Sequence, residues 1–403
     1  MKVAIIGASL AGASAAVTLR DEGFDGEIEL IGEEPELPYE RPPLSKEYLA
    51  GAQAFEQSLV HPAEVYEQRS IELRTGAAVT SVDPRERTAV LADGSRLRAD
   101  AFVIATGTRS RRPPIAGLEL EGIHDLRSRA DADALRAQIA PGRRAVVAGM
   151  GFVGCEVAAT LRDAGVEVVA IEAFSTPLER ILGPEIGRVV ADLQAEHGVE
   201  MLLGDGVQAF EGDGAVRAVQ TMSGRLVECD FAVVGLGAQP NTELLEGSGI
   251  TVSNGVVVDE YCRTNVEGVY AAGDVALHAH PLVGGHIRVE HWRNAARQGA
   301  AAARSILGKG APYAELHWFW SDQYDANIQY LGHHQDFDEL VVRGSLDDRQ
   351  FLAFYLKDGV PQSAVAFNMA RQLRRASKLL EAGRPVDAGL LRDPGADLRR
   401  VAA

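Results

Sequence analysis

The chain is poor in cysteine. Its 403 residues include three, Cys155, Cys229 and Cys262, which are far apart in sequence and form no Cys-x-x-Cys pair. This spacing excludes a disulfide relay and a zinc ribbon, and it is typical of proteins that fold in a reducing compartment. We expect the three thiols to be packing residues.

The sequence also lacks long apolar runs and an excess of positive charge. No run approaches the roughly 20 residues of a membrane span, and Met1 and Lys2 lead directly into a strand-like segment rather than a signal peptide. The net charge of −17 argues against nucleic acid as the main partner, and an acidic partner would need a local cationic surface. We therefore expect a cytoplasmic protein with no membrane partner, a monomer or weak dimer.

Two glycine fingerprints are the main feature that the sequence does contain, GASLAG at residues 7–12 and GMGFVG at 149–154. Each follows an apolar run typical of a buried parallel strand and precedes a segment typical of a helix. Glycines there permit a tight turn, the approach of a pyrophosphate to the backbone and close helix packing. Ser9 replaces the middle glycine of the first fingerprint, a change we expect to be tolerated because serine is small.

An acidic residue follows each fingerprint about 20 residues later, where a ribose-binding carboxylate is expected. These are Glu33 and Glu172, each at or just after the end of a predicted strand. No cation neighbours Glu172, so the second site favours NAD(H) over NADP(H). A lone fingerprint can be an ordinary strand-turn-helix corner, but two in context predict a bound flavin and a bound nicotinamide, and hence electron transfer.

The order of the motifs predicts an α/β protein with two Rossmann-like dinucleotide-binding domains and a C-terminal α+β domain. Further strand-and-turn motifs on both sides of the second fingerprint indicate that one domain interrupts the other. The expected domains are an FAD-binding domain at 1–112 and 239–310, an NAD(H)-binding domain at 113–238 and a C-terminal domain at 311–403. We expect the tail from Pro385 to be loosely ordered, since it is rich in Asp, Gly and Arg.

Several longer motifs give the chain a resemblance to a known family along nearly its whole length. They are ERPPLSK at 40–46, ATG at 105–107, AGD at 272–274, VEHWRNA at 289–295 and WFWSDQY at 318–324. With them the chain resembles the FAD-dependent NADH:ferredoxin reductases of bacterial P450 and aromatic-ring dioxygenase systems, the putidaredoxin reductase-like family.

The resemblance implies the cofactors FAD and NADH, a [2Fe-2S] ferredoxin as partner, no metal in this chain, and a set of contact residues. For FAD they are Gly7, Ser9, Ala11, Gly12, Glu33, Arg41, Lys46, Val79, Thr106, Gly107, Arg127, Gly273, Asp274 and Trp292. For NAD(H) they are Gly149, Gly151, Phe152, Val153, Gly154, Glu156, Glu172, Arg180 and Gly237. Lys46 and Glu156 are implied to lie near flavin N5 as positioning residues, although Glu156 could simply be a carboxylate at a helix N-terminus.

Ferredoxin docking is expected at aromatic and cationic residues. Alternation puts Trp318 and Trp320 on one face of a strand, and the resemblance suggests that they border the flavin and the docking surface. Helical spacing aligns two cationic stripes, either of which could instead be an ordinary solvated helix face: Arg371, Arg374, Arg375 and Lys378, and Arg293, Arg297 and Arg304. His291 is expected at a helix start or in packing rather than as a base.

Other functions share the two-nucleotide core. A flavoprotein disulfide reductase or an NADH oxidase or peroxidase needs a redox cysteine beside the flavin, and the segment PLSK at 43–46 has none. Rubredoxin, nitrite and monodehydroascorbate reductases vary the acceptor on the same scaffold, and fold does not choose between them. A redox-sensing FAD protein that binds a partner remains a non-enzymatic alternative.

Overall fold

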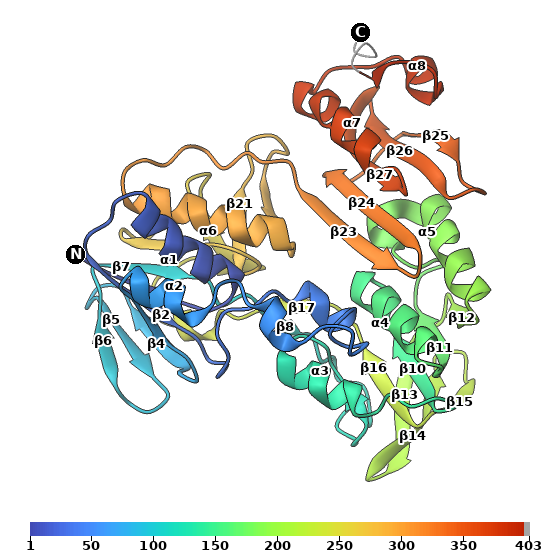
Figure 1. Ribbon diagram of the computed structural model, residues 1–403, viewed down its shortest axis with the longest axis horizontal. Coiled ribbons are helices and arrows are strands. Elements are labelled where there is room, and N and C mark those ends of the chain that lie inside the picture. Colours follow the sequence, from blue (N-terminus) through green and yellow to red (C-terminus); the bar gives the residue numbers. More distant parts are fainter. Residues whose placement is uncertain (399–403) are drawn as a thin grey trace. The chain divides into compact units, whose positions relative to one another are not determined.

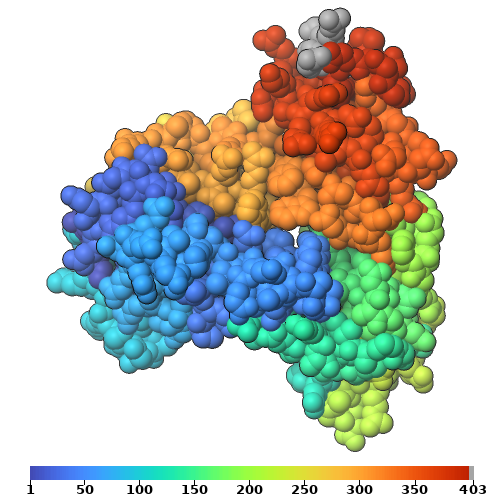
Figure 2. All heavy atoms as spheres, viewed as in Figure 1, coloured from blue at the N-terminus to red at the C-terminus, as the bar shows by residue number. Residues whose placement is uncertain are grey.

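A computed structural model describes residues 1–398 and divides the chain into two compact units (Figures 1 and 2). Unit 1 comprises Met1–Glu40, Phe55–Arg109 and Gln239–Phe319. Unit 2 comprises Arg41–Ala54, Ser110–Ala238 and Trp320–Ala403. The last five residues of the predicted C-terminal domain, 399–403, lie outside the described part.

Unit 1 is built on a five-stranded parallel sheet. Its strands, in spatial order, are β20 (Val269–Ala271), β7 (Ala101–Ile104), β1 (Lys2–Ile6), β2 (Glu27–Ile31) and β3 (Ile71–Arg74). Apolar residues alternate between two cores along these strands, so both faces are covered. This is the doubly covered parallel sheet expected of a Rossmann-like domain.

Helices cover one face of this sheet and small sheets cover the other. The helices α1 (Leu10–Asp21) and α6 (Trp292–Ile306) lie side by side, with α2 (Ala63–Gln68) nearby (Figure 1). A Cβ on Gly299 of α6 would overlap the backbone of Ala11, so glycine is what permits this close packing. The opposite core is closed by two small sheets and a 3₁₀ turn: β4 (Val79–Asp83), β5 (Thr88–Leu91) and β6 (Arg96–Arg98); β18 (Val252–Ser253), β19 (Gly255–Val258), β21 (Ala276–Ala279) and β22 (His286–Arg288); and η3 (Glu243–Leu245).

Unit 2 contains a second five-stranded parallel sheet. Its order is β12 (Glu200–Leu203), β11 (Glu167–Glu172), β10 (Arg144–Ala148), β16 (Phe231–Val234) and β9 (Ile123–His124). One face packs on an antiparallel sheet of β13 (Val207–Asp213), β14 (Ala215–Thr221) and β15 (Leu226–Glu228). Its helices are α3 (Arg129–Arg136), α4 (Phe152–Asp163) and α5 (Glu179–Glu196). Each fingerprint therefore connects a strand of a parallel sheet, β1 or β10, to a helix, α1 or α4, as predicted.

The C-terminal region is an antiparallel sheet with two helices, which confirms the predicted α+β character. The sheet order is β23 (Trp318–Gln323), β24 (Ala326–Gly332), β27 (Val360–Phe367), β26 (Gln350–Lys357) and β25 (Glu339–Ser345). The helices are α7 (Ala370–Ala382) and α8 (Ala388–Arg392). The remaining elements are the 3₁₀ turns η1 (Pro42–Ser45) and η2 (Phe55–Ser58) and the paired short strands β8 (Thr108–Ser110) and β17 (Ala238–Pro240).

The tail after Pro385 is ordered as far as residue 398, so the expectation of a loose tail is wrong for that part. The guanidinium of Arg343 is buried and donates hydrogen bonds to backbone carbonyls of the tail, including Pro394 at 2.8 Å and Ala396 at 2.7 Å. Sequence composition could not reveal this clamp, because the arginine lies about 50 residues away along the chain.

The two compact units do not correspond one to one to the three predicted domains, since unit 2 combines residues 110–238 with the chain from Trp320 onward and also includes residues 41–54. Sequence analysis assigned this segment to the FAD-binding domain, whereas compactness groups it with unit 2. The reason is local: η1 packs on α4, and the hydroxyl of Thr160 in α4 donates a 2.8 Å hydrogen bond to the carbonyl of Ser45. The division into three functional domains stays a prediction.

Candidate functional site

The first fingerprint forms a tight turn between β1 and α1. Gly7 has φ of 117°, and a Cβ there would overlap the carbonyl of Ala105; a Cβ on Gly12 would overlap the carbonyl of Gly7. Ser9 occupies the N-cap position of α1 in an extended conformation, and its hydroxyl makes no capping hydrogen bond. The serine therefore leaves the N–H groups at the start of α1 available to an anion, which is the condition for a pyrophosphate to bind there.

The second fingerprint repeats this geometry between β10 and α4. Gly149 has φ of 93°, and a Cβ on Gly154 would overlap the carbonyl of Gly149, so both glycines are required by the fold. A Cβ on Gly151 would meet no atom within 4 Å, and the φ of −73° at this position suits any residue. The fold itself therefore does not require glycine here. The middle glycine thus borders open space, as a residue must where the backbone approaches a dinucleotide.

The uncapped starts of α1 and α4 contrast with α3, a helix to which no cofactor role is assigned. At α3 the Ser128 hydroxyl accepts from the Asp131 N–H and the Asp131 carboxylate accepts from the Ser128 N–H, which closes a capping box. Side chains thus satisfy the end of α3, while α1 and α4 keep free donors at the carboxyl edge of each parallel sheet. Ligands bind at this edge in open α/β sheets, so the residues present fit the two dinucleotides.

Glu172 ends β11, and its carboxylate is buried against the second fingerprint. One oxygen accepts from the Met150 N–H at 2.6 Å and the other accepts from the Phe174 N–H at 3.0 Å. Carboxylate oxygens carry further lone pairs, so the predicted ribose contact remains open to Glu172. The structure adds a second role that the sequence pattern did not reveal, since this side chain fixes the glycine turn itself.

The other predicted FAD contacts divide between the units. In unit 1, the Thr106 hydroxyl donates to the Asn241 carbonyl at 2.7 Å, Asp274 is buried at the turn before β21, and the Gly273 N–H donates to Gln298 at 2.9 Å. Glu33 is exposed just after β2. Gly107, Val79 and Trp292, also in unit 1, lie after β7, at the start of β4 and at the first residue of α6.

Three predicted FAD contacts, Arg41, Lys46 and Arg127, belong to unit 2. The Arg41 guanidinium donates a hydrogen bond to the Arg127 carbonyl, and the Arg127 N–H donates to Asp131 at 3.1 Å. Arg41, at the start of the motif ERPPLSK after Glu40, is thereby tied to the loop before α3. Both arginines are predicted contacts whose roles rest on the family resemblance.

A buried polar cluster joins the two predicted positioning residues. The Lys46 ammonium lies 3.3 Å from the Glu156 carboxylate, which also accepts hydrogen bonds from the hydroxyls of Ser45 at 2.5 Å and Ser321 at 2.7 Å. Burial raises the pKa of the Glu156 carboxyl, while the Lys46 charge and the two hydroxyls act to lower it. The predicted ion pair is present within unit 2, and Glu156 is not simply a helix-end carboxylate, because η1 and β23 both reach it.

Sequence reasoning missed Ser45 and Ser321. Both lie inside motifs that were recognised, next to Lys46 and Trp320, but nothing in a single sequence says that their hydroxyls meet a carboxylate on α4. The Lys46 ammonium also lies 5.6 Å from the centre of the Trp320 ring, within the range of a cation–π contact. These residues form the acid–lysine cluster: Ser45, Lys46, Glu156, Trp320 and Ser321.

The remaining predicted NAD(H) contacts surround the second turn. Val153 is 45% exposed although it is apolar, and Phe174, over which the Arg180 guanidinium lies at 5.9 Å, is 41% exposed. Phe152 begins α4, and Gly237 has φ of 99° after β16. Exposed apolar side chains beside an uncapped helix end are consistent with a surface that a ligand covers.

The three cysteines are buried, as expected for packing residues. Burial raises the pKa of Cys155 and Cys262, and it raises the pKa of Cys229 to about 12. The Cys155 thiol, the closest to a fingerprint in sequence, faces the carbonyl of Met150 at 3.6 Å. A thiolate is the reactive form of cysteine, so none of these residues offers redox thiol chemistry.

The two cationic stripes differ in their partners. On α6, Arg293 and Arg297 pair with Glu315 at 3.6 and 3.1 Å, and Arg304 pairs with Glu22 at 2.9 Å. The α7 stripe is exposed, and no ion pair to it is found within residues 1–398; its members are Arg371, Arg374, Arg375 and Lys378. Only the α7 stripe therefore presents uncompensated positive charge. It belongs to the red, C-terminal part of the surface in Figure 2.

The aromatic predictions agree with the strand geometry. Along β23, Trp318 and Trp320 alternate with buried residues and so share one face. His291 precedes α6, and its ring stacks on Phe319 with centres 4.2 Å apart, a packing role as expected.

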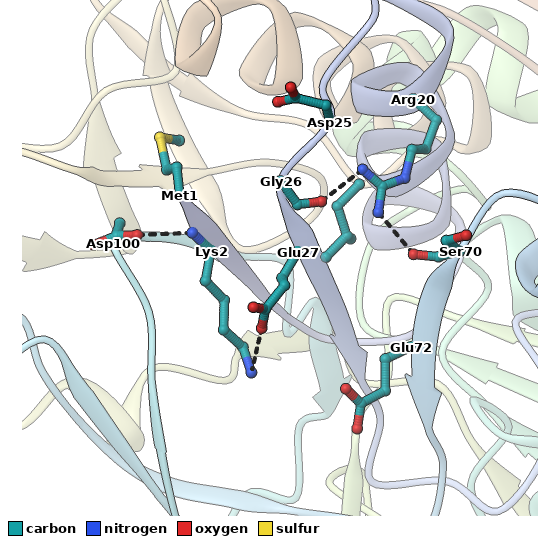
Figure 3. A pocket seen from close by; sticks show the side chains of 10 residues that line it. Met1, Lys2, Arg20, Asp25, Gly26, Glu27, Ser70, Glu72 and Asp100 are labelled. Atoms are coloured by element: carbon teal, nitrogen blue, oxygen red, sulfur yellow. Dashed lines mark hydrogen bonds and ion pairs between the residues drawn. The ribbon is translucent and has the colours of Figure 1, made fainter.

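A surface depression in unit 1 lies at the wrong edge of the sheet for a dinucleotide (Figure 3). It is lined by Lys2, Glu27, Glu72 and Asp100, which stand at or next to the amino ends of parallel strands, whereas the first fingerprint follows a carboxyl end. The Lys2 ammonium lies 3.8 Å from the Glu27 carboxylate there, and we assign the depression no function.

Comparison with known proteins agrees with this geometry. The profile of the pyridine nucleotide-disulphide oxidoreductase family matches residues 1–299, and that of a reductase C-terminal domain matches 318–402. The chlorobenzene dioxygenase ferredoxin reductase component of Cupriavidus sp. (strain PS12) is 40% identical over 97% of this chain and 95% of its own length. Rhodocoxin reductase of Rhodococcus erythropolis is 37% identical over 100% of this chain and 95% of its own length.

A solved structure, the covalent complex of putidaredoxin reductase and putidaredoxin, matches with a TM-score of 0.96. It is 32% identical and covers 99% of this chain and 97% of the other. The chain therefore belongs to the pyridine nucleotide-disulphide oxidoreductase family, and within it to the group of bacterial ferredoxin reductases. It is an enzyme, an oxidoreductase that binds FAD and uses NAD(H). No helix within residues 1–398 is long and apolar enough to cross a membrane.

Proposed function

We propose that this enzyme passes electrons from NADH through bound FAD, one at a time, to a [2Fe-2S] ferredoxin that supplies a cytochrome P450 or a ring-hydroxylating dioxygenase. The observation that carries the proposal is the presence of two formed dinucleotide turns in a chain without a reactive thiol. Electrons that arrive by hydride transfer then need an acceptor outside the chain. The full-length similarity to reductases named for oxygenase systems supports a ferredoxin as that acceptor.

Bound flavin would supply the chemistry, which is acceptance of one hydride, with its two electrons, and release of those electrons singly. The chain's own residues have only to bind and orient the cofactors. The start of α1 and the first glycine turn would hold the FAD pyrophosphate, and Asp274 its ribityl chain. The second turn would hold NADH, with Gly151 leaving room for the pyrophosphate and Glu172 facing the adenosine ribose. The acid–lysine cluster would keep a charge pair of fixed geometry near the reacting ring.

The α7 stripe supports electrostatic steering of an acidic ferredoxin. Its four exposed cations occur at helical spacing i, i+3, i+4 and i+7, and no carboxylate within the described chain neutralises them. The α6 cations already pair with Glu315 and Glu22. Their positive charge is therefore partly compensated and attracts an acidic partner less strongly. We therefore assign the steering role to α7 and treat α6 as a structural surface.

Stopped-flow mixing of the FAD-loaded enzyme with NADH under anaerobic conditions tests the activity. Fast loss of flavin absorbance, followed by fast reoxidation on mixing with a bacterial [2Fe-2S] oxygenase ferredoxin, is the expected result. Slow reduction by NADH would favour a redox-sensing protein. Fast reoxidation by dioxygen but not by ferredoxin would favour an NADH oxidase.

Charge reversal tests the docking surface separately. The double substitution Arg374→Glu and Arg375→Glu should lower ferredoxin-dependent cytochrome c reduction about tenfold at low salt, with ferricyanide reduction unchanged. Arg297→Glu with Arg304→Glu changes the net charge equally and is the matched control. Equal losses in both double variants, or no loss in the first, would count against steering by α7.

A further inference from the structure

Three buried histidines meet in unit 1, and none of them is among the residues assigned to the cofactors. His278 lies on β21, His280 follows that strand, and His317 directly precedes β23. Their exposed fractions are 1%, 2% and 5%, and one ring nitrogen from each falls within 4.8 Å of those of the others. Residues two apart on a strand point to the same side, which explains how the first two join.

The spacing of the rings matches tetrahedral coordination. Zinc–nitrogen bonds of about 2.0 to 2.1 Å at tetrahedral angles require imidazole centres about 5 Å apart. The observed separations of the ring centres are 5.2 Å for His278 and His280, 4.8 Å for His280 and His317, and 6.1 Å for His278 and His317. Small side-chain rotations would therefore bring the ligand nitrogens from this arrangement to bonding distance of a single ion.

His278 is the residue that hydrogen bonding leaves unexplained. Neither of its ring nitrogens reaches hydrogen-bond geometry, and its interaction with the backbone of Ile287 on the paired strand β22 falls short of it. Leaving a buried imidazole without partners costs free energy, and buried polar groups in native proteins almost always have them. A ligand between the three rings would supply the missing partner.

His280 is held in the manner of a metal ligand. Its Nδ1 accepts weakly from the N–H groups of Leu282 and Val283, both at 3.2 Å, so its Nε2 carries the proton and donates to the Glu315 carbonyl at 3.0 Å. Metal-binding histidines typically donate their other N–H to a carbonyl or carboxylate in this way. Nδ1 could exchange its two long hydrogen bonds for an ion while the bond to Glu315 stays.

The surroundings also suit a metal. All three rings are buried, and a metal is bound by the neutral form of imidazole. The loop immediately after His280 is largely exposed, with Leu282 at 52%, so the cluster lies close in sequence to a solvent-exposed segment. Within residues 1–398 no acidic side chain joins the cluster, so three imidazole nitrogens would define the site.

We propose that His278, His280 and His317 bind one divalent d-block cation, Zn²⁺ by preference, with solvent as the fourth ligand. Three imidazole nitrogens suit zinc, copper, nickel and cobalt, whereas magnesium and calcium require oxygen ligands. The ion would tie β21, which follows the flavin-contact residue Asp274, to the segment that enters β23. The proposal does not depend on which ferredoxin the enzyme serves.

The test uses the full-length, FAD-loaded enzyme purified without a polyhistidine tag and stripped with a chelator. Titration with Zn²⁺, followed by gel filtration and elemental analysis, should give one zinc per FAD. His278→Gln and His317→Gln should each weaken zinc binding by roughly 100-fold, while His61→Gln, a partly buried histidine of the same unit outside the cluster, should leave it unchanged. Zinc should raise the thermal midpoint of the wild type and the His61 variant only.

Pulsed EPR of the wild-type protein loaded with one Cu²⁺ keeps the proposal falsifiable even if the cluster variants lose FAD. Three coordinated imidazole nitrogens are expected. Absence of stoichiometric zinc, unchanged affinity in both cluster variants, or a copper spectrum without multiple imidazoles would overturn the proposal.

Discussion

Replacing Lys46 by methionine should make the stability of the enzyme strongly dependent on pH. Methionine keeps the length of the side chain but removes the ammonium that lies 3.3 Å from the Glu156 carboxylate. Burial raises the pKa of Glu156, and the Lys46 charge is the main influence that lowers it again. Without that charge the carboxyl must either stay ionised and unpaired or take up a proton.

The free energy of protonating Glu156 sets an upper limit on the stability that the Lys46→Met variant loses. Binding a proton at pH 7 to a carboxyl whose ordinary pKa is 4.5 costs about 3.4 kcal/mol, at about 1.4 kcal/mol per pH unit. This is within the roughly 3 to 5 kcal/mol that breaking a buried ion pair costs. A raised pKa in the folded state favours folding below pH 4.5 and loses that contribution as the pH rises through the folded-state pKa. The Lys46→Met variant should therefore lose stability as the pH rises from 4.5 toward the folded-state pKa, by at most about 1.4 kcal/mol per pH unit.

Urea unfolding of the FAD-loaded protein, followed by circular dichroism at pH 5.5, 6.5 and 7.5, measures this slope. The control is the double variant Lys46→Met with Glu156→Gln, in which the titrating group is absent. The stability difference between the two variants should grow as pH rises, and an infrared band of a protonated carboxyl should appear only in the single variant. A difference that stays constant with pH would refute the coupling between Lys46 and Glu156.

Three further outcomes are expected. Gly151→Ala should fold normally but raise the KM for NADH about tenfold or more, since its Cβ enters open space, whereas Gly154→Ala should lower the thermal midpoint because its Cβ overlaps the carbonyl of Gly149; equal effects on folding would contradict the two readings. Arg343→Met should destabilise the C-terminal region by about 2 to 4 kcal/mol and speed proteolysis of the tail, because buried carbonyls lose their donor; an unchanged cleavage rate would argue against the clamp. Iodoacetamide should leave Cys155 unmodified and NADH-dependent ferricyanide reduction intact under native conditions; rapid inactivation with labelling there would reopen a redox thiol.

Sequence patterns predicted the architecture well where the information was local. Part of the first fingerprint turn depends on residues that are close in sequence, since a Cβ on Gly12 would overlap the carbonyl of Gly7 and the positive φ of Gly7 favours glycine. The parallel strands could also be predicted locally. They are short apolar runs, because burial on both faces of the sheet removes the alternation of polar and apolar residues. The prediction of a loosely ordered tail after Pro385 was wrong, because the order of the tail depends on Arg343, a residue that no local pattern links to it.

The candidate site was predicted less completely than the fold. Lys46 and Glu156 were expected to pair, but Ser45 and Ser321 join them only because η1, α4 and β23 meet in unit 2. The α6 and α7 stripes looked alike in sequence. Only their distant carboxylate partners distinguished them, since helical spacing says which cations align and not what lies opposite.

The sequence by itself determined that two dinucleotide turns exist and that no cysteine pair accompanies them, because turns, strand periodicity and residue counts are properties of neighbours along the chain. Tertiary structure alone decided what Glu172 holds, which cationic helix keeps its charge, and that His278, His280 and His317 converge. Each of these depends on side chains that are remote in sequence. Their contacts exist only after the buried sheets have brought the strands and helices together.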